Sequence, residues 1–141
     1  MGQLDRSKLL QKEVLQIEKV ELGEDGFIYV RQMTGHERDT FEQSLIKEKK
    51  DSKGTITGYD RATSDFRAKL AVVTICDEQG ILLLQPGDYP ALSANMSAKT
   101  LEKIINTAQK LNSITEEDKE NLVKNSEAGL GEGSSSGSVE N

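Results

Sequence analysis

The segment Ser97–Asn112 constrains the fold most, because its apolar residues all fall on one face of a helix. They recur at spacings of three, one, three and three, and are Leu101, Ile104, Ile105, Ala108 and Leu111. This pattern is typical of an amphipathic helix that buries one side. A helix of this kind must pack against other apolar elements of the chain.

A second helical pattern covers Arg61–Cys76 and offers a matching apolar face. Asp77–Gln79 and Gly80 are expected to end that helix, with Gly80 in a left-handed conformation. We expect the two helices to meet in the core and to pack on one face of a β-hairpin. The core residues predicted at this contact are Phe66, Leu70, Val73, Leu101, Ile104, Ile105 and Ala108.

The hairpin is predicted from two apolar runs, Val14–Leu22 and Phe27–Met33, that flank the sequence Gly-Glu-Asp-Gly. Two glycines and an aspartate between β-branched and aromatic residues favour a tight antiparallel connection. Thr34 and Glu37 then match a capping box, which predicts that a helix starts at Thr34.

The remaining segments are expected to be less regular. The helix from Thr34 should end in the charged run Lys47–Asp51, and Asp51–Tyr59 is predicted to be a flexible loop. Pro86–Pro90 is predicted to be a turn. Capping signals around Thr115 predict a last helix that extends to about residue 125.

These expectations define an α+β fold, with an N-terminal antiparallel β-hairpin packed on a small bundle of about four helices. Residues 1–12 are expected to form a flexible N-terminal arm, and residues 13–126 a single domain. Residues 127–141 are rich in Gly and Ser and contain no Lys, Arg or aromatic residue, so we predict a disordered tail.

Composition argues against several classes of function. The 141 residues carry a net charge of −6, which disfavours binding to nucleic acid or to an anionic membrane surface. A single cysteine excludes an intramolecular disulfide, and apolar runs are too short for a membrane span or a signal peptide. The sequence therefore predicts a cytosolic protein.

The residues that could support catalysis do not form a recognisable set. His36 is the only histidine and lies near a predicted helix start, whereas Cys76 lies at a helix C-terminus, where the dipole disfavours a thiolate. Acidic residues between Asp60 and Asp88 follow no metal-ligand spacing. We therefore predict no catalytic residues, no cofactor and no metal, and hence no enzyme.

Three motifs carry a resemblance to a known family. Val30–Asp39 resembles the pattern V-R-x-hydrophobic-S/T-G-x-E-R-D, and Arg67–Gly80 resembles a helix that ends in Cys-Asp-Glu-x-Gly. Ala108–Asn112, with the sequence Ala-Gln-Lys-Leu-Asn, follows in the same order. Together they resemble the tail assembly chaperones of long-tailed, siphovirus-type double-stranded DNA bacteriophages over roughly residues 13–126. The chain departs from the pattern at Gln85–Asn95, where two prolines and a glycine interrupt what is often a short helix.

The resemblance implies a noncatalytic protein of the bacterial host cytoplasm that binds the phage tape measure protein and is absent from the mature virion. It also implies a possible longer product, made by ribosomal frameshifting, that recruits tail tube subunits, and self-association is possible. The alternative is a structural subunit of a phage tail or baseplate. A small enzyme using His36 or Cys76 is a third hypothesis.

Binding to a tape measure protein is expected to use apolar contact with its helical segments rather than charge, because no charged patch is evident in the sequence. The surfaces with the least obvious cover are one face of the hairpin and the short apolar run that follows Gly80. The predicted partner-binding residues are Ile28, Val30, Ile81, Leu82, Leu83 and Leu84.

Overall fold

The computed structural model describes residues 2–61, 65–115, 117, 118, 120 and 121. Along the chain, the elements are α1 (Arg6–Leu9), β1 (Ile17–Glu21), η1 (Gly23–Asp25), β2 (Phe27–Arg31), α2 (Gly35–Gln43), β3 (Ile46–Lys50), β4 (Ile56–Arg61), α3 (Phe66–Val72), β5 (Ile75–Cys76), η2 (Pro86–Asp88), α4 (Tyr89–Asn95) and α5 (Ala98–Leu111). This confirms the α+β class. The predicted tail lies outside the described residues, as does most of the helix predicted after Thr115.

The predicted N-terminal hairpin is present as β1 and β2, which pair antiparallel from Ile17 opposite Arg31 to Glu21 opposite Phe27. The strands are shorter than the apolar runs that predicted them. Both glycines of the connection adopt positive φ angles, 79° at residue 23 and 114° at residue 26, which side chains other than glycine rarely tolerate. The backbone N–H of Leu22 donates to the carbonyl oxygen of residue 26 at 2.8 Å and closes the turn.

The helix predicted over Arg61–Cys76 is wrong at both ends, because Arg61 is the last residue of β4 and the C-terminal end is a strand. Helix α3 ends at Val72, and Ile75–Cys76 forms β5, which pairs antiparallel with β2 and completes a sheet of order β1-β2-β5. The β-branched residues at this end favour extended backbone. The hydroxyl of Thr74, which is fully buried, donates to the Leu70 carbonyl at 2.8 Å and closes the helix.

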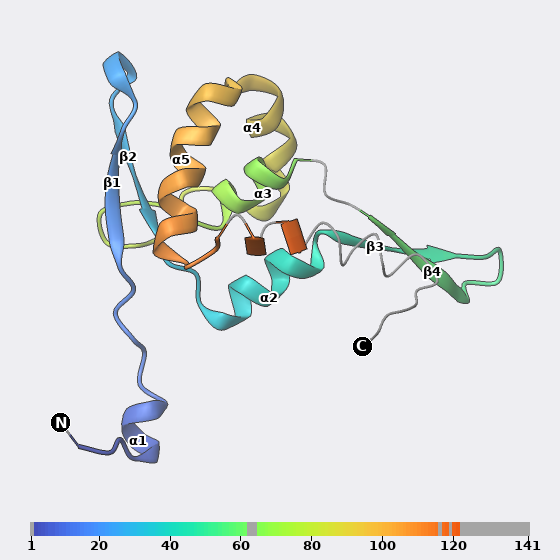
Figure 1. The fold of residues 1–141 in the computed structure, drawn as a ribbon, viewed down its shortest axis with the longest axis horizontal. Coiled ribbons are helices and arrows are strands. Elements are labelled where there is room, and N and C mark those ends of the chain that lie inside the picture. Colours follow the sequence, from blue (N-terminus) through green and yellow to red (C-terminus); the bar gives the residue numbers. More distant parts are fainter. Residues whose placement is uncertain (1, 62–64, 116, 119, 122–141) are drawn as a thin grey trace.

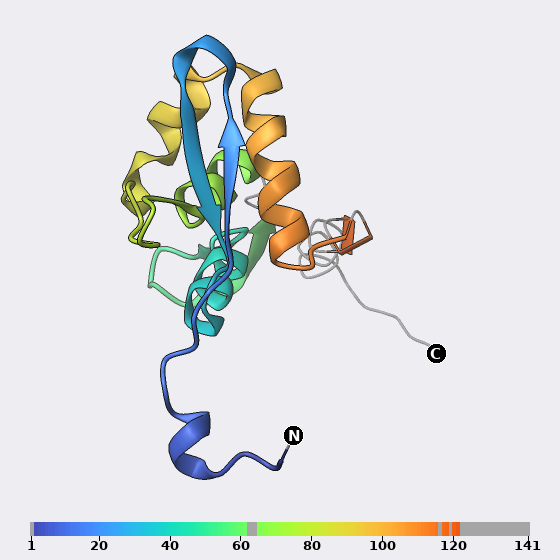
Figure 2. The same cartoon turned by 90° about the vertical axis from the view of Figure 1, so that its left-hand side faces the viewer.

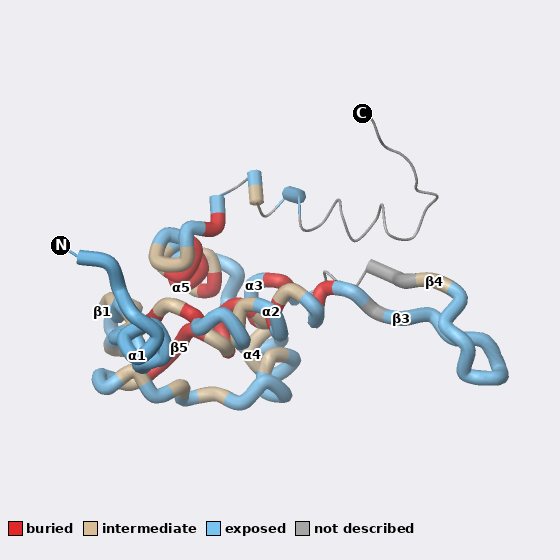
Figure 3. Tube along the Cα trace, turned by 90° about the horizontal axis from the view of Figure 1, so that it is seen from below, coloured by how far each residue is buried: buried red, intermediate tan, exposed pale blue. Residues whose placement is uncertain are grey.

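The loop predicted for Asp51–Tyr59 is wrong over Ile56–Tyr59, which belong to β4, whereas residues 51–55 form the turn of a second antiparallel hairpin between β3 and β4. The carboxylate of Asp51 accepts the N–H groups of Lys53 and Thr55 at 2.9 and 3.0 Å, which fixes the turn. Figure 3 shows this hairpin projecting from the body of the protein, with exposed residues along much of its length. Strands with two solvated faces need no alternation of apolar residues, so the pattern was absent from the sequence.

The turn predicted for Pro86–Pro90 is the start of a helix. Residues Pro86–Asp88 form η2, and α4 begins at Tyr89 with Pro90 in its first turn, where a missing N–H costs no intrahelical hydrogen bond. The carboxylate of Asp88 accepts the N–H of Gln85 at 2.7 Å. The two prolines and the glycine of this stretch were expected to interrupt the short helix that the family pattern often has. That short helix is present as α4.

Helix α5 lies against the sheet, with α3 and α4 beyond it (Figures 1 and 2). Six of the seven predicted core residues are buried, and the seventh, Val73, is half-buried and packs against the same cluster. Helix α2 also contributes to the core through Phe41, whose ring meets that of Phe66 edge-on at 5.5 Å between centroids. Buried Leu45 extends this cluster beyond the end of α2.

The segment predicted as an N-terminal arm contains the four-residue helix α1, which stands apart from the body of the protein (Figure 1). None of its residues is buried, and the side chains of Leu4, Leu9 and Leu10 are exposed. The carboxylate of Asp5 caps the helix by accepting the Lys8 N–H at 2.9 Å.

Candidate functional site

The three motifs that carry the family resemblance supply the first candidate sites. At the end of β2, Arg31 is 6% exposed and forms a bidentate pair with Glu37 of α2, with both N–O distances 2.9 Å. The hydrogen bond from the guanidinium is the main reason that the pKa of Glu37 is lowered and that of Arg31 is raised. This charge pair ties the sheet to α2.

Glu37 has a second structural role at the same place. Its carboxylate accepts the Thr34 N–H at 2.9 Å, and its own N–H donates to the Thr34 hydroxyl at 3.1 Å. The predicted capping box is therefore confirmed. One carboxylate thus satisfies a helix terminus and a buried cation.

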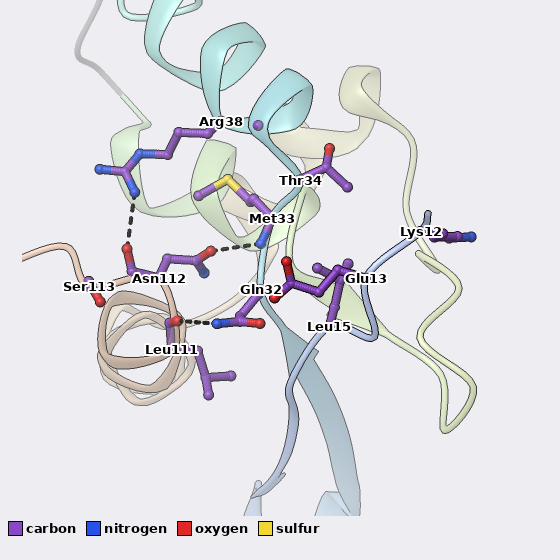
Figure 4. A pocket seen from close by; sticks show the side chains of 11 residues that line it. Lys12, Glu13, Leu15, Gln32, Met33, Thr34, Arg38, Leu111, Asn112 and Ser113 are labelled. Carbon is purple, nitrogen blue, oxygen red and sulfur yellow. Dashed lines mark hydrogen bonds between the residues drawn. The ribbon is translucent and has the colours of Figure 1, made fainter. Parts of the chain in front are cut away.

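The Ala108–Asn112 motif joins this junction from α5 (Figure 4). The Asn112 side chain accepts the Met33 N–H at 2.7 Å, and its backbone carbonyl accepts from Arg38 at 3.0 Å. Gln32 donates to the carbonyl of Leu111 at 3.2 Å. A cavity of about 570 Å³ adjoins these residues, but the hydrogen bonds of the motif already hold α5 to the β2–α2 connection.

The third motif builds the turn after β5. Asp77 accepts the N–H groups of Gln79 and Ile81 at 2.8 and 3.0 Å, and Gly80 has a φ of 87°. The left-handed conformation predicted for Gly80 is confirmed, although it closes a turn after a strand and not a helix. All three motifs therefore have identifiable roles in the fold.

The two residues of the enzyme hypothesis lie in different settings. Cys76 is 1% exposed in β5, and burial raises the pKa of its thiol, which lowers the thiolate fraction at neutral pH. His36 is exposed on α2. Within the described part of the chain, no three His, Cys, Asp or Glu side chains are grouped so as to hold a metal ion.

The predicted partner-binding residues separate into three groups. Val30 is fully buried in the core and Ile28 is half-buried against it, so assigning Val30 to a free surface was wrong. Ile81 and Leu83 are exposed, at 65% and 58%. Leu82 is half-buried and forms a β-bridge with Cys76, and Leu84 is half-buried where the chain approaches α4.

Leu84 lines an open groove of about 760 Å³ that follows α4. Its apolar lining comes from three separate segments: the end of β1, the run before η2, and α4 with the residue after it. The large apolar side chains are Leu22, Leu84, Leu92 and Met96. Each is partly buried and packs against the core, so the floor of the groove is anchored to the interior.

Sequence reasoning missed most of this groove. Leu22 was assigned to a strand, and the segment that supplies Leu92 from α4 and Met96 just after it was predicted as a turn followed by an unassigned stretch. The signal that could have revealed α4 is Pro90 shortly after Asp88, since proline is common in the first turn of a helix.

No protein-family model, curated protein or solved structure matches this chain. Among the described residues, no helix is long and apolar enough to cross a membrane.

Proposed function

We propose that this protein is a noncatalytic phage tail assembly chaperone that binds the tape measure protein in the cytoplasm of the bacterial host. The observation that carries the proposal is the groove along α4, which holds four large, partly buried apolar side chains open to solvent. A groove of this kind suits the apolar face of an amphipathic helix. The order of the three motifs in the sequence supports the same family.

The size of the groove favours many weak contacts over one strong contact. Burying a large apolar side chain contributes roughly 1.5–3 kcal/mol, so a groove that accepts about three of them gives weak, reversible binding once the cost of association is subtracted. Several copies of the chaperone on one long partner would cover its exposed apolar helices and prevent aggregation. Weak individual contacts would also let the copies leave when tail tube subunits replace them.

Co-expression with the tape measure protein of the same phage tests this function. We expect wild-type protein to increase the soluble yield of its partner, and Ala91→Gln to reduce that increase. Ala91 is an exposed residue of α4 that lines the groove, and an amide placed in an apolar contact costs roughly 1–3 kcal/mol, or about fivefold or more in affinity.

Ala94→Gln is the matched control, because Ala94 is also exposed on α4 but does not line the groove. It should support the same soluble yield as wild type. Equal losses for the two variants would show that the groove is not the binding surface. If the partner stays insoluble with wild type and the protein is found in purified particles, the structural-subunit hypothesis replaces the chaperone.

A longer frameshifted product would extend this function to the recruitment of tail tube protein. We propose that the domain described here holds the tape measure protein in both products, while the added segment binds the tube subunit. A downstream overlapping reading frame, followed by a very long helical reading frame, is the gene arrangement expected for this role.

A further inference from the structure

We propose that the groove along α4 selects a basic amphipathic helix, with Lys or Arg residues flanking its apolar face. The inference rests on the proposed function in taking a segment of the tape measure protein as the natural ligand. It goes further by stating the charge of that segment and the place where its basic residues lie.

The charges of the groove carry the proposal. The two charged side chains that line it are both carboxylates, Asp25 in η1 and Asp88 at the end of η2. Both residues are exposed, and no Lys or Arg is found among the described residues of the lining. An apolar floor with carboxylates at its margin complements an apolar helix face with flanking cations and repels one with flanking acids.

The positions of the two carboxylates fix where the cations are needed. Asp88 immediately precedes α4, whereas Met96 and Ser97 of the lining follow its last residue, so the groove extends along the whole helix. The chain turns from α4 into α5 at the same end of the molecule as the tip of the β1–β2 hairpin, which carries Asp25 (Figures 1 and 2). The carboxylates therefore lie towards opposite ends of the groove.

This length corresponds to a short docked helix. The seven residues of α4 rise about 1.5 Å each, so two to three turns of a parallel or antiparallel partner helix match the groove. Large apolar residues at positions i, i+4 and i+7 would meet the floor, and a basic residue near each end would approach Asp25 or Asp88. Met96 gives the floor an adaptable side chain, which suits a ligand that presents several related segments.

Three synthetic helical peptides test the charge preference. They share one apolar face and differ only in the residues that flank it, which are Lys, Gln or Glu. We expect the Lys peptide to bind the full-length protein roughly three- to tenfold more tightly than the Glu peptide at low salt, measured by fluorescence anisotropy, because each exposed ion pair contributes up to about fivefold. The difference should shrink at about 1 M salt, where the Debye length is near 3 Å.

Variants locate the preference in the groove. Asp25→Asn should reduce the Lys-over-Glu preference by about twofold or more, whereas Asp39→Asn, a change at an exposed acid on α2, should leave it unchanged. Ala91→Lys should weaken binding of the Lys peptide, and Ala94→Lys should not. Equal binding of the three peptides, or equal effects of the aspartate variants, would overturn the inference.

The outcomes separate this inference from the proposed function. If co-expression makes the tape measure protein soluble but the peptides show no charge preference, the chaperone stands and the basic ligand is wrong. If the Lys peptide binds in the groove but the tape measure protein remains insoluble, the charge preference stands and the proposed function fails.

Discussion

Replacing Leu70 by alanine should lower the free energy of unfolding by roughly 2–5 kcal/mol. Leu70 is fully buried in α3, which packs against both α5 and α4. Truncation would remove apolar contacts within the core cluster and leave a cavity that closely packed neighbours cannot fill completely. Urea denaturation followed by circular dichroism at neutral pH measures the difference.

Leu83→Ala is the matched control, since it removes the same atoms from a side chain that is 58% exposed. We expect its effect to stay below about 1 kcal/mol, as is usual for surface substitutions away from the core. A similar loss for both variants would mean that the change acts through the unfolded state. A Leu70→Ala variant as stable as wild type would contradict the packing of α3 against α5.

The sequence predicted the elements that have one buried face and one solvent-exposed face, or a turn with special backbone requirements. Helix α5 buries a single continuous face, so its residues recur at helical spacing and could be identified directly. The β1–β2 hairpin was predictable because its connection needs two glycines at positive φ. In these cases the pattern along the chain is set by local geometry.

The elements that were missed depend on contacts between distant segments. β5 has two residues and exists because Val30 of β2 pairs with Ile75, which no local pattern reveals. Val30 was predicted to bind a partner for the same reason, since the strand and helices that cover it lie elsewhere in the sequence. The β3–β4 hairpin is charged and solvated, so it lacks the alternation that identifies strands.

Of the six predicted partner-binding residues, only Leu84 lines the groove, because the groove too is built from segments that are distant in the sequence. The run that contains it was recognisable as apolar, but the groove also needs Leu22 and Leu92 from segments far away in the chain. The residues of the family motifs occur elsewhere, at turns, helix caps and the buried ion pair. A motif-based search therefore finds the scaffold of this protein, whereas its candidate binding surface emerges only after folding.

The ion pair between Arg31 and Glu37 leads to the second prediction, that Glu37→Gln lowers the free energy of unfolding by about 3 kcal/mol at pH 7. Glutamine can still serve as the third residue of the capping box, so the helix start is retained. The change instead leaves the Arg31 side chain, which is 7% exposed, without its countercharge. The value lies at the lower end of the range for broken buried pairs because the Glu37 side chain is 24% exposed.

Glu42→Gln provides the control on the same helix. It breaks the pair between Arg38 and Glu42, whose side chains are 32% and 36% exposed, and exposed pairs of this kind contribute about 0.5 kcal/mol or less. The two variants remove one carboxylate each from α2, so the change in net charge is identical. Glu37 lies in the first turn of α2 and Glu42 in its last, where the helix dipole contributes roughly 0.3–1 kcal/mol. A difference between the variants that clearly exceeds this contribution reflects the burial of Arg31 rather than the overall charge of the protein.

The pH dependence of the Glu37→Gln effect follows from the sign of the pKa shift. Folding lowers the pKa of Glu37 from its ordinary value of 4.5, so the pair contributes its full stability above pH 4.5 and loses it as pH falls through the lowered pKa. Wild type should thus approach the variant in stability as Glu37 is protonated, and urea denaturation at pH 7 and pH 3 should show a shrinking gap. A gap that stays constant would show that the loss comes from packing, because packing does not depend on the charge of residue 37.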